Sequence, residues 1–159
     1  MFLPGTTSIL GSNSTMNSRE EAMTDRFVDT SGWAAWIEPS DRSHAQAVAT
    51  FDDVVQQGGR FVTTNWVLVE STALLTRPIR FAKTKQIELF REIRQYPCVS
   101  IVTIAEGVES AAWQLWEARP DKHWTLVDCS SFVVMERHGI REALTADHHF
   151  EQAGFVKLL

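Results

Sequence analysis

The chain has 159 residues, a formal net charge of −5, and 44% hydrophobic and 22% charged residues, which is the composition of a globular domain with a full core. No apolar stretch approaches the roughly 20 residues that a membrane-spanning helix requires, so a membrane span is excluded. The negative charge argues against a protein that coats nucleic acid through its overall charge. It is compatible with an enzyme whose acidic site is bordered by a basic surface.

Residues 1–25 are rich in Ser, Thr and Asn and show no periodicity, which predicts a disordered amino-terminal extension. They lack the basic start and the apolar stretch of a signal peptide. Met16 and Met23 leave open a later start of translation. Cys98 and Cys129 both lie in apolar runs, which favours reduced core thiols of a cytoplasmic protein and leaves a lone disulfide as the alternative.

Residues 26–159 are predicted to form one domain in which short apolar strands alternate with helices. Strands are expected at residues 26–29, 60–63, 98–103, 142–145 and 155–159. Helices are expected at residues 32–38, 41–57, 66–77, 80–95, 105–118 and 126–138, with a helical turn at 147–152. Three of these helices are assigned one apolar face each, namely Ala45, Val48, Phe51 and Val55, then Phe81, Ile87, Phe90 and Ile93, and finally Ala105, Val108, Ala112 and Leu115. The pattern predicts a three-layer α/β/α fold around a parallel sheet of about five strands.

Four carboxylates hold comparable places in this pattern. Asp29 ends the first strand, Asp147 follows the fourth, Glu70 lies one to two turns into the helix after the second, and Asp128 lies in the first turn of its helix. Functional groups of an open parallel sheet gather beyond the carboxyl ends of its strands. Each acid by itself is more often a helix cap or a surface charge. Together they would repel one another, and a hard divalent cation such as Mg²⁺ or Mn²⁺ relieves that repulsion.

The segments VDTSGW, NWVLVES, TLVDCSSFVVM and TADHHFEQAGF, in this order and spacing, resemble the four acidic motifs of PIN-domain ribonucleases. The resemblance covers residues 26–159 and is greatest to VapC-type toxins of bacterial and archaeal toxin–antitoxin pairs. It implies that the first and fourth strands are adjacent. It also implies that the metal-binding and catalytic residues are Asp29, Glu70, Asp128 and Asp147.

Hydroxyl side chains accompany these acids. Thr30 and Thr145 match the small hydroxyl residues that neighbour the acids in the resembling family. Thr125 stands three residues before Asp128, the spacing of an N-cap hydroxyl with an acid at the third helical position. We expect these three threonines to support the acids.

The activity implied by the resemblance is hydrolysis of RNA phosphodiester bonds by an endoribonuclease that depends on Mg²⁺ or Mn²⁺. Asp128 or Asp147 would also orient the attacking water. A toxin of this kind implies a cognate antitoxin protein, a homodimer and a cytoplasmic location. The alternatives are a housekeeping RNA-processing nuclease and a non-catalytic PIN-like module that binds RNA or protein. A phosphatase is disfavoured, because no D-x-D loop follows the first strand.

Residues 77–94 hold six basic side chains against two acids, so Arg80 and Lys83 are candidate RNA contacts; a solvated helix face is the alternative. His148 and His149 are interpreted as surface residues, because adjacent helical side chains point about 100° apart and do not both reach one metal.

Three tryptophans lie in the helices nearest the first two acidic motifs. An apolar patch there is a hypothetical docking site for an antitoxin helix or a second subunit, and the residues concerned are Trp33, Trp36 and Trp66.

Overall fold

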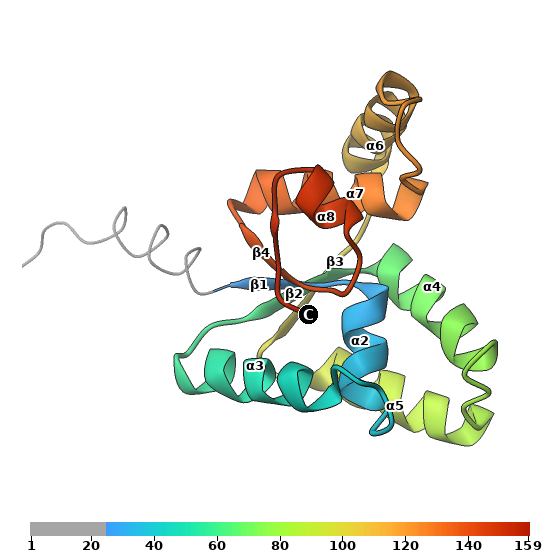
Figure 1. Ribbon diagram of the computed structural model, residues 1–159, viewed down its shortest axis with the longest axis vertical. Helices are drawn as coiled ribbons and strands as arrows, with labels where there is room; N and C mark the ends of the chain where they lie inside the picture. The colour runs from blue at the N-terminus through green and yellow to red at the C-terminus, as the bar shows by residue number, and fades with distance from the viewer. Residues whose placement is uncertain (1–24) are drawn as a thin grey trace, which may run out of the picture.

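A computed structural model describes residues 25–159 (Figure 1). Its strands are β1 (Arg26–Val28), β2 (Phe61–Thr64), β3 (Val99–Val102), β4 (Glu142–Leu144) and β5 (Val156–Lys157). Its helices are α2 (Thr30–Ile37), α3 (His44–Gln56), α4 (Asn65–Thr76), α5 (Lys83–Gln95), α6 (Glu106–Ala118), α7 (Leu126–His138) and α8 (His149–Gln152). The predicted order of strands and helices is confirmed.

The five strands form one parallel sheet in the order β3-β2-β1-β4-β5. Helices α6 and α7 lie on one side of this sheet, and α2, α3 and α5 lie on the other (Figure 1). This is the predicted three-layer fold. β1 pairs with β4 through Phe27 and Ala143 and through Val28 and Leu144, so the segments that follow these two strands meet at one edge.

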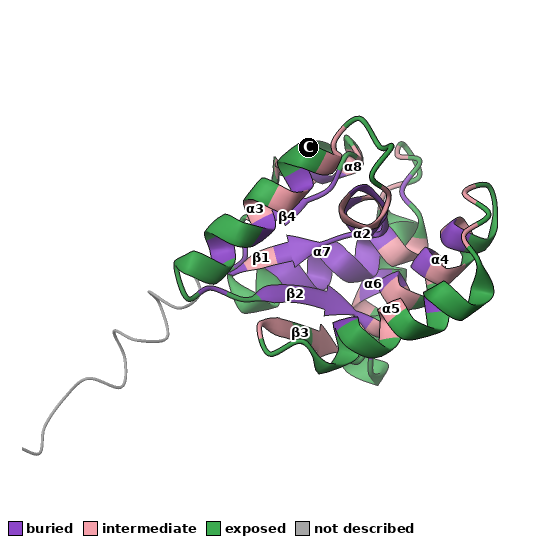
Figure 2. Cartoon of the chain, turned by 90° about the horizontal axis from the view of Figure 1, so that it is seen from below, coloured by how far each residue is buried: buried purple, intermediate pink, exposed green. Residues whose placement is uncertain are grey.

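The core is concentrated on the central strands and on α7. Figure 2 shows β1, β2 and α7 as mostly buried and α3 and α5 as partly exposed. Every residue of α7 from Asp128 to Met135 is buried, as its apolar sequence indicates. β3 is only partly buried although its sequence is strongly apolar, because it forms the edge of the sheet.

Two predicted helix faces were partly wrong. In α3 the core side chains are Ala47, Phe51 and Val54, whereas Val55 is 44% exposed. The buried face of this helix is therefore rotated by about one residue position relative to the predicted face. In α5 the predicted inward residue Ile87 is 49% exposed. α5 also begins at Lys83 rather than at residue 80, because the chain between α4 and α5 turns back over the end of α4. There Phe81 N donates to Leu75 O.

Gly32 lets α2 lie directly against the end of β4. A Cβ atom at this position would lie 1.9 Å from the carbonyl oxygen of Leu144. Only glycine allows this approach, and the approach brings the first turn of α2 beside the residues that follow β4.

The ends of the predicted domain and the cysteines can be compared with the structure in part. Asp25, placed by prediction in the extension, is buried and pairs with Arg60 at 3.0 Å. The rest of the predicted disordered segment lies outside the described residues. Cys98 and Cys129 are both free, which excludes the lone disulfide between them. Over residues 25–159, every helix is too short or too polar to cross a membrane.

Candidate metal centre

Asp29 follows β1 directly and is the N-cap of α2. Its Oδ2 atom accepts hydrogen bonds from Ser31 N at 3.4 Å and from Ser31 Oγ at 3.2 Å. The helix therefore begins at Thr30 rather than at the predicted residue 32, because the acid at the end of the strand provides the cap itself. The carboxylate is therefore held at the carboxyl edge of the sheet by the first turn of its own helix.

Thr145 follows β4 and connects Asp29 to the fourth motif. Its hydroxyl donates to Asp29 Oδ2 at 3.1 Å and accepts from Asp147 N at 3.0 Å. Ser31 Oγ lies 3.0 Å from the same hydroxyl and accepts from Ala146 N at 2.9 Å. The pairing of β1 with β4 thus joins two segments more than 100 residues apart in one hydrogen-bonded network.

The other two acids are held in the same manner. Thr125 caps α7 and forms a capping box with Asp128, since Thr125 N donates to Asp128 Oδ2 at 2.7 Å and Asp128 N donates to Thr125 Oγ1 at 3.1 Å. This local arrangement is the one that the sequence predicts. Glu70 is on α4, and its Oε2 accepts a short hydrogen bond from the Thr30 hydroxyl.

The four predicted acids share one open cleft of about 220 Å³. The cleft is lined by Asp29, Thr30, Ser31, Glu70, Leu74, Thr125, Asp128, Asp147 and His149. Two of the three predicted threonines line it, and the third, Thr145, is fully buried behind Asp29. Sequence reasoning missed Ser31 as a site residue. The signal available was its place two residues after an acid that ends a strand.

Burial and the repulsion between carboxylates make Asp29, Glu70 and Asp128 harder to ionise than free carboxylic acids. Asp29 is 4% exposed, and loss of hydration, reinforced by the charges of Asp128 and Glu70, raises its pKa from 3.8 to about 6. Burial also raises the pKa of Glu70 and the pKa of Asp128, and Asp147 raises both further. The cleft concentrates negative charge that the described residues only partly neutralise.

His149 also belongs to the cleft, which corrects its interpretation as a surface residue. Its side chain is 16% exposed, and its Nδ1 lies 3.4 Å from Asp128 Oδ2 and 3.3 Å from Asp147 Oδ2. The reason is the packing of α8, because Asp147 Oδ1 accepts from His149 N at 2.9 Å and starts this short helix, and Phe150 of α8 packs against Phe132 of α7. His148 is 67% exposed, as expected.

The basic residues lie outside the cleft. Arg80 lines a separate cavity of about 790 Å³ at the end of α4, together with Thr76, Arg77 and Pro78. Lys83 is the first residue of α5 and is exposed. The structure therefore does not bring these two candidate RNA contacts into the group of acids.

The predicted tryptophan patch is not a continuous exposed surface. Trp33 is fully buried and donates to the Thr63 hydroxyl at 3.2 Å, so it belongs to the core. Trp36 stacks on Phe51, and it is half-buried, as is Trp66.

The sequence matches the profile of the family described as PIN domain over residues 26–156. The chain belongs to the PIN domain family. It is 31% identical over 132 residues to the 23S rRNA-specific endonuclease VapC20 of Mycobacterium tuberculosis, which covers 83% of this chain and 96% of VapC20. This confirms the predicted relationship to VapC-type PIN ribonucleases.

Solved structures show the same relationship in three dimensions. The crystal structure of Mycobacterium tuberculosis VapC20, a Sarcin-Ricin loop cleaving toxin, matches with a TM-score of 0.72 and 32% identity, covering 82% of this chain and 95% of that one. The structure of FitAcB from Neisseria gonorrhoeae matches with a TM-score of 0.62 and 16% identity, covering 84% and 96% of the two chains. The second match supports the fold alone.

Proposed function

We propose that this chain is a metal-dependent endoribonuclease and the toxin component of a toxin–antitoxin pair. The observation that carries the proposal is the shared cleft of Asp29, Glu70, Asp128 and Asp147, in a chain of the PIN domain family that resembles an RNA endonuclease over most of its length. We propose these four acids as the metal-binding and catalytic residues.

The donor set of the cleft fits a hard divalent cation. Four carboxylates offer oxygen ligands, and the buried Nδ1 of His149 has no hydrogen-bond partner. Mg²⁺ or Mn²⁺ would relieve the repulsion that raises the pKa values of Asp29, Glu70 and Asp128. When bound, such an ion activates water for attack on the phosphate and stabilises charge on the leaving 3′ oxygen.

The hydroxyl residues orient the acids for this role. Ser31 and Thr145 hold Asp29, Thr30 holds Glu70, and Thr125 holds Asp128, so these three carboxylates are fixed before metal or RNA binds. Asp147 has a side chain 30% exposed, more than that of Asp128, so it is the acid better placed to orient an attacking water. Asp128 stays the second candidate for that role.

We propose Arg80 and Lys83 as contacts to the RNA backbone. Both are exposed, and residues 77–94 carry an excess of four positive charges. Glu70 and Leu74 line the cleft on α4, and a helical rise of about 1.5 Å per residue puts Arg77 about 10 Å beyond Glu70. An RNA strand that enters the cleft would therefore reach this basic segment within one or two phosphates.

The decisive experiment measures RNA cleavage by the purified full chain with Mg²⁺ or Mn²⁺, with EDTA, and after substitution of the acids. The relative acts on 23S rRNA, so a ribosomal RNA stem-loop is the first substrate to test. We expect Asp29→Asn and Asp128→Asn to reduce cleavage at least about 100-fold while the fold is kept, because a neutral amide lacks the negative charge with which a carboxylate attracts a divalent cation.

Asp52→Asn is the matched control, since Asp52 is an exposed acid on α3. Its cleavage rate should equal that of the wild type. Undiminished cleavage by the two cleft variants, or cleavage that survives EDTA, would refute the assignment. A chain that binds RNA without cutting it under any metal would instead support the non-catalytic module.

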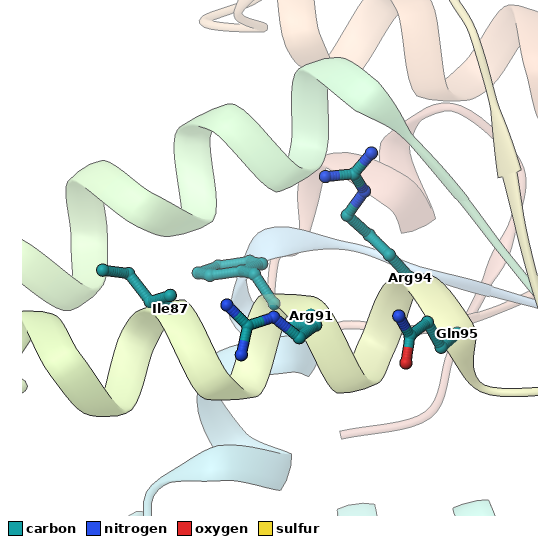
Figure 3. Close-up of a pocket in the computed structure, with 5 residues that line it drawn as sticks. Ile87, Arg91, Arg94 and Gln95 are labelled. Carbon is teal, nitrogen blue, oxygen red and sulfur yellow. The ribbon is translucent and has the colours of Figure 1, made fainter.

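We propose a groove on α5 as the contact for the antitoxin. It has a volume of about 420 Å³ and is lined by Ile87, Phe90, Arg91, Arg94 and Gln95. Figure 3 shows Arg91 and Arg94 projecting from α5 beside the neighbouring helix α4. The exposed Ile87 side chain, followed along α5 by the two arginines, suits a partner segment that presents an apolar residue next to acids.

Growth arrest on expression, relieved by co-expression of the adjacent gene product, would distinguish a toxin from a housekeeping nuclease. The double variant Arg91→Glu with Arg94→Glu should still arrest growth, but co-expression of the adjacent gene product should no longer relieve that arrest. The homodimer stays a prediction, which light scattering of the purified chain tests. An RNA substrate would place the enzyme in the cytoplasm.

A further inference from the structure

His149 carries an unusual atom. Among the described residues 25–159, its Nδ1 is the only buried side-chain nitrogen or oxygen that has no hydrogen-bond partner. Buried polar atoms of this kind are rare, because an unpaired one has lost its hydrogen bonds to water without gaining others. The atom is aimed at the cleft, 3.4 Å from Asp128 Oδ2 and 3.3 Å from Asp147 Oδ2.

We propose that His149 Nδ1 is a direct ligand of the metal in this cleft and that it biases the site toward Mn²⁺ over Mg²⁺. This inference rests on the proposed function. Adjacent ligands of an octahedral ion with bonds of about 2.1 Å lie about 3 Å apart. The separations of Nδ1 from the two carboxylate oxygens are close to that spacing.

The chemistry of the nitrogen gives the metal preference. Both ions favour carboxylate oxygens, but Mn²⁺, as a first-row transition ion, accepts an imidazole nitrogen more readily than Mg²⁺ does. In the tautomer with its proton on Nε2, the ring presents the Nδ1 lone pair to the cleft. A centre with one imidazole among its carboxylates therefore stabilises Mn²⁺ more than a centre with carboxylates alone.

The backbone fixes the ring in this position. Asp147 Oδ1 accepts from His149 N at 2.9 Å, which leaves Asp147 Oδ2 directed at the ring. Asp128 Oδ2 is held by Thr125 N at 2.7 Å. The three ligand atoms are thus arranged before any ion binds, and this lowers the cost of ordering them.

His148 is the natural control for His149. Its side chain is 67% exposed, and its Nδ1 lies 3.5 Å from Asp147 Oδ1, the carboxylate oxygen that accepts from His149 N. The ligand atoms of Asp147, His148 and His149 all lie within 4.8 Å of one another, so proximity alone does not separate the two histidines. Metal binding does.

The test is calorimetric titration of the metal-free full chain with Mn²⁺ and with Mg²⁺, for the wild type, His149→Asn and His148→Asn. Asparagine can put an amide oxygen near the position of Nδ1, so it replaces the nitrogen ligand by an oxygen ligand. His149→Asn should weaken Mn²⁺ binding about 10-fold or more and change Mg²⁺ binding less than about 3-fold. His148→Asn should change neither.

Pulsed electron paramagnetic resonance of bound Mn²⁺ gives a second readout that does not depend on how a variant folds. The wild type and His148→Asn should show coupling to one directly bound nitrogen, and His149→Asn should show none. The inference is overturned if Mn²⁺ bound to the wild type shows no coupling to nitrogen. It is also overturned if His149→Asn leaves the ratio of Mn²⁺ to Mg²⁺ affinity unchanged. Neither result contradicts the proposed nuclease activity. A wild type that binds neither ion overturns both.

Discussion

The acidic cleft and the basic segment of residues 77–94 both adjoin α4, yet they are built in opposite ways. The cleft acids are largely buried and fixed by hydroxyl and backbone donors, and burial raises the pKa values of three of them. The six basic residues of the segment are all exposed. Changes in the cleft should therefore alter stability, metal binding and chemistry together. Changes in the basic segment should leave stability and metal binding unchanged and alter only the binding of partners, namely RNA at Arg80 and Lys83 and the antitoxin at Arg91 and Arg94.

The largest effect is expected where the cleft depends on backbone packing. Gly32→Ala would put a Cβ atom 1.9 Å from the Leu144 carbonyl oxygen and push α2 away from β4. We expect a loss of about 3 kcal/mol or more in the free energy of unfolding, measured by urea denaturation, and a loss of metal binding. The control is Gly107→Ala in α6, where an added Cβ meets nothing within 4 Å, and it should be neutral or stabilising.

Asp29→Asn should reveal the electrostatic cost of the metal-free cleft. The pKa of Asp29 is raised from 3.8 to about 6, so the folded protein holds the proton more tightly than the unfolded chain does. The contribution of this bound proton to the free energy of unfolding is fully present below pH 4 and is lost as pH rises through about 6.

Without metal, Asp29→Asn should therefore match the wild type near pH 4 and exceed its free energy of unfolding by up to about 3 kcal/mol above pH 6. Asparagine keeps the N-cap, so helix capping does not obscure the comparison. Saturating Mn²⁺ should remove or reverse the difference. A gain that is independent of pH would contradict the assigned cause.

Thr145→Val tests the support behind the acids. The substitution keeps the shape but removes the hydroxyl that donates to Asp29 and accepts from Asp147 N. Metal affinity should fall about 10-fold or more, and the free energy of unfolding should fall by about 1 to 2 kcal/mol. Calorimetric titration and urea denaturation measure the two quantities, and Thr145→Ser should restore both.

The smallest structural effect is expected in the basic segment. Arg80→Glu with Lys83→Glu should weaken RNA binding about 10-fold at low salt and flatten its salt dependence, because phosphate contacts release counterions. Unfolding and metal binding should not change. Arg42→Glu with Arg141→Glu is the control pair, since both residues are exposed outside this segment. Equal losses in the two double variants would mean that only net charge matters.

The sequence by itself determined the order of elements, the parallel three-layer architecture and the capping box of Asp128, because strands, helix caps and hydrophobic runs are local patterns. It also singled out the four acids, through their places after strands and near helix starts. It misjudged the inner faces of α3 and α5, since the side of a helix that is buried depends on the neighbour against which the helix packs.

Only the tertiary structure decided the composition of the cleft. Ser31 joins it because β1 pairs with β4 and because Gly32 admits the Leu144 carbonyl, and those contacts join residues more than 100 positions apart. His149 joins it because α8 packs against α7, a contact that two adjacent histidines do not reveal. Local sequence fixes what a residue offers chemically, but long-range packing fixes which atoms it meets, and the chemistry of this protein depends on both.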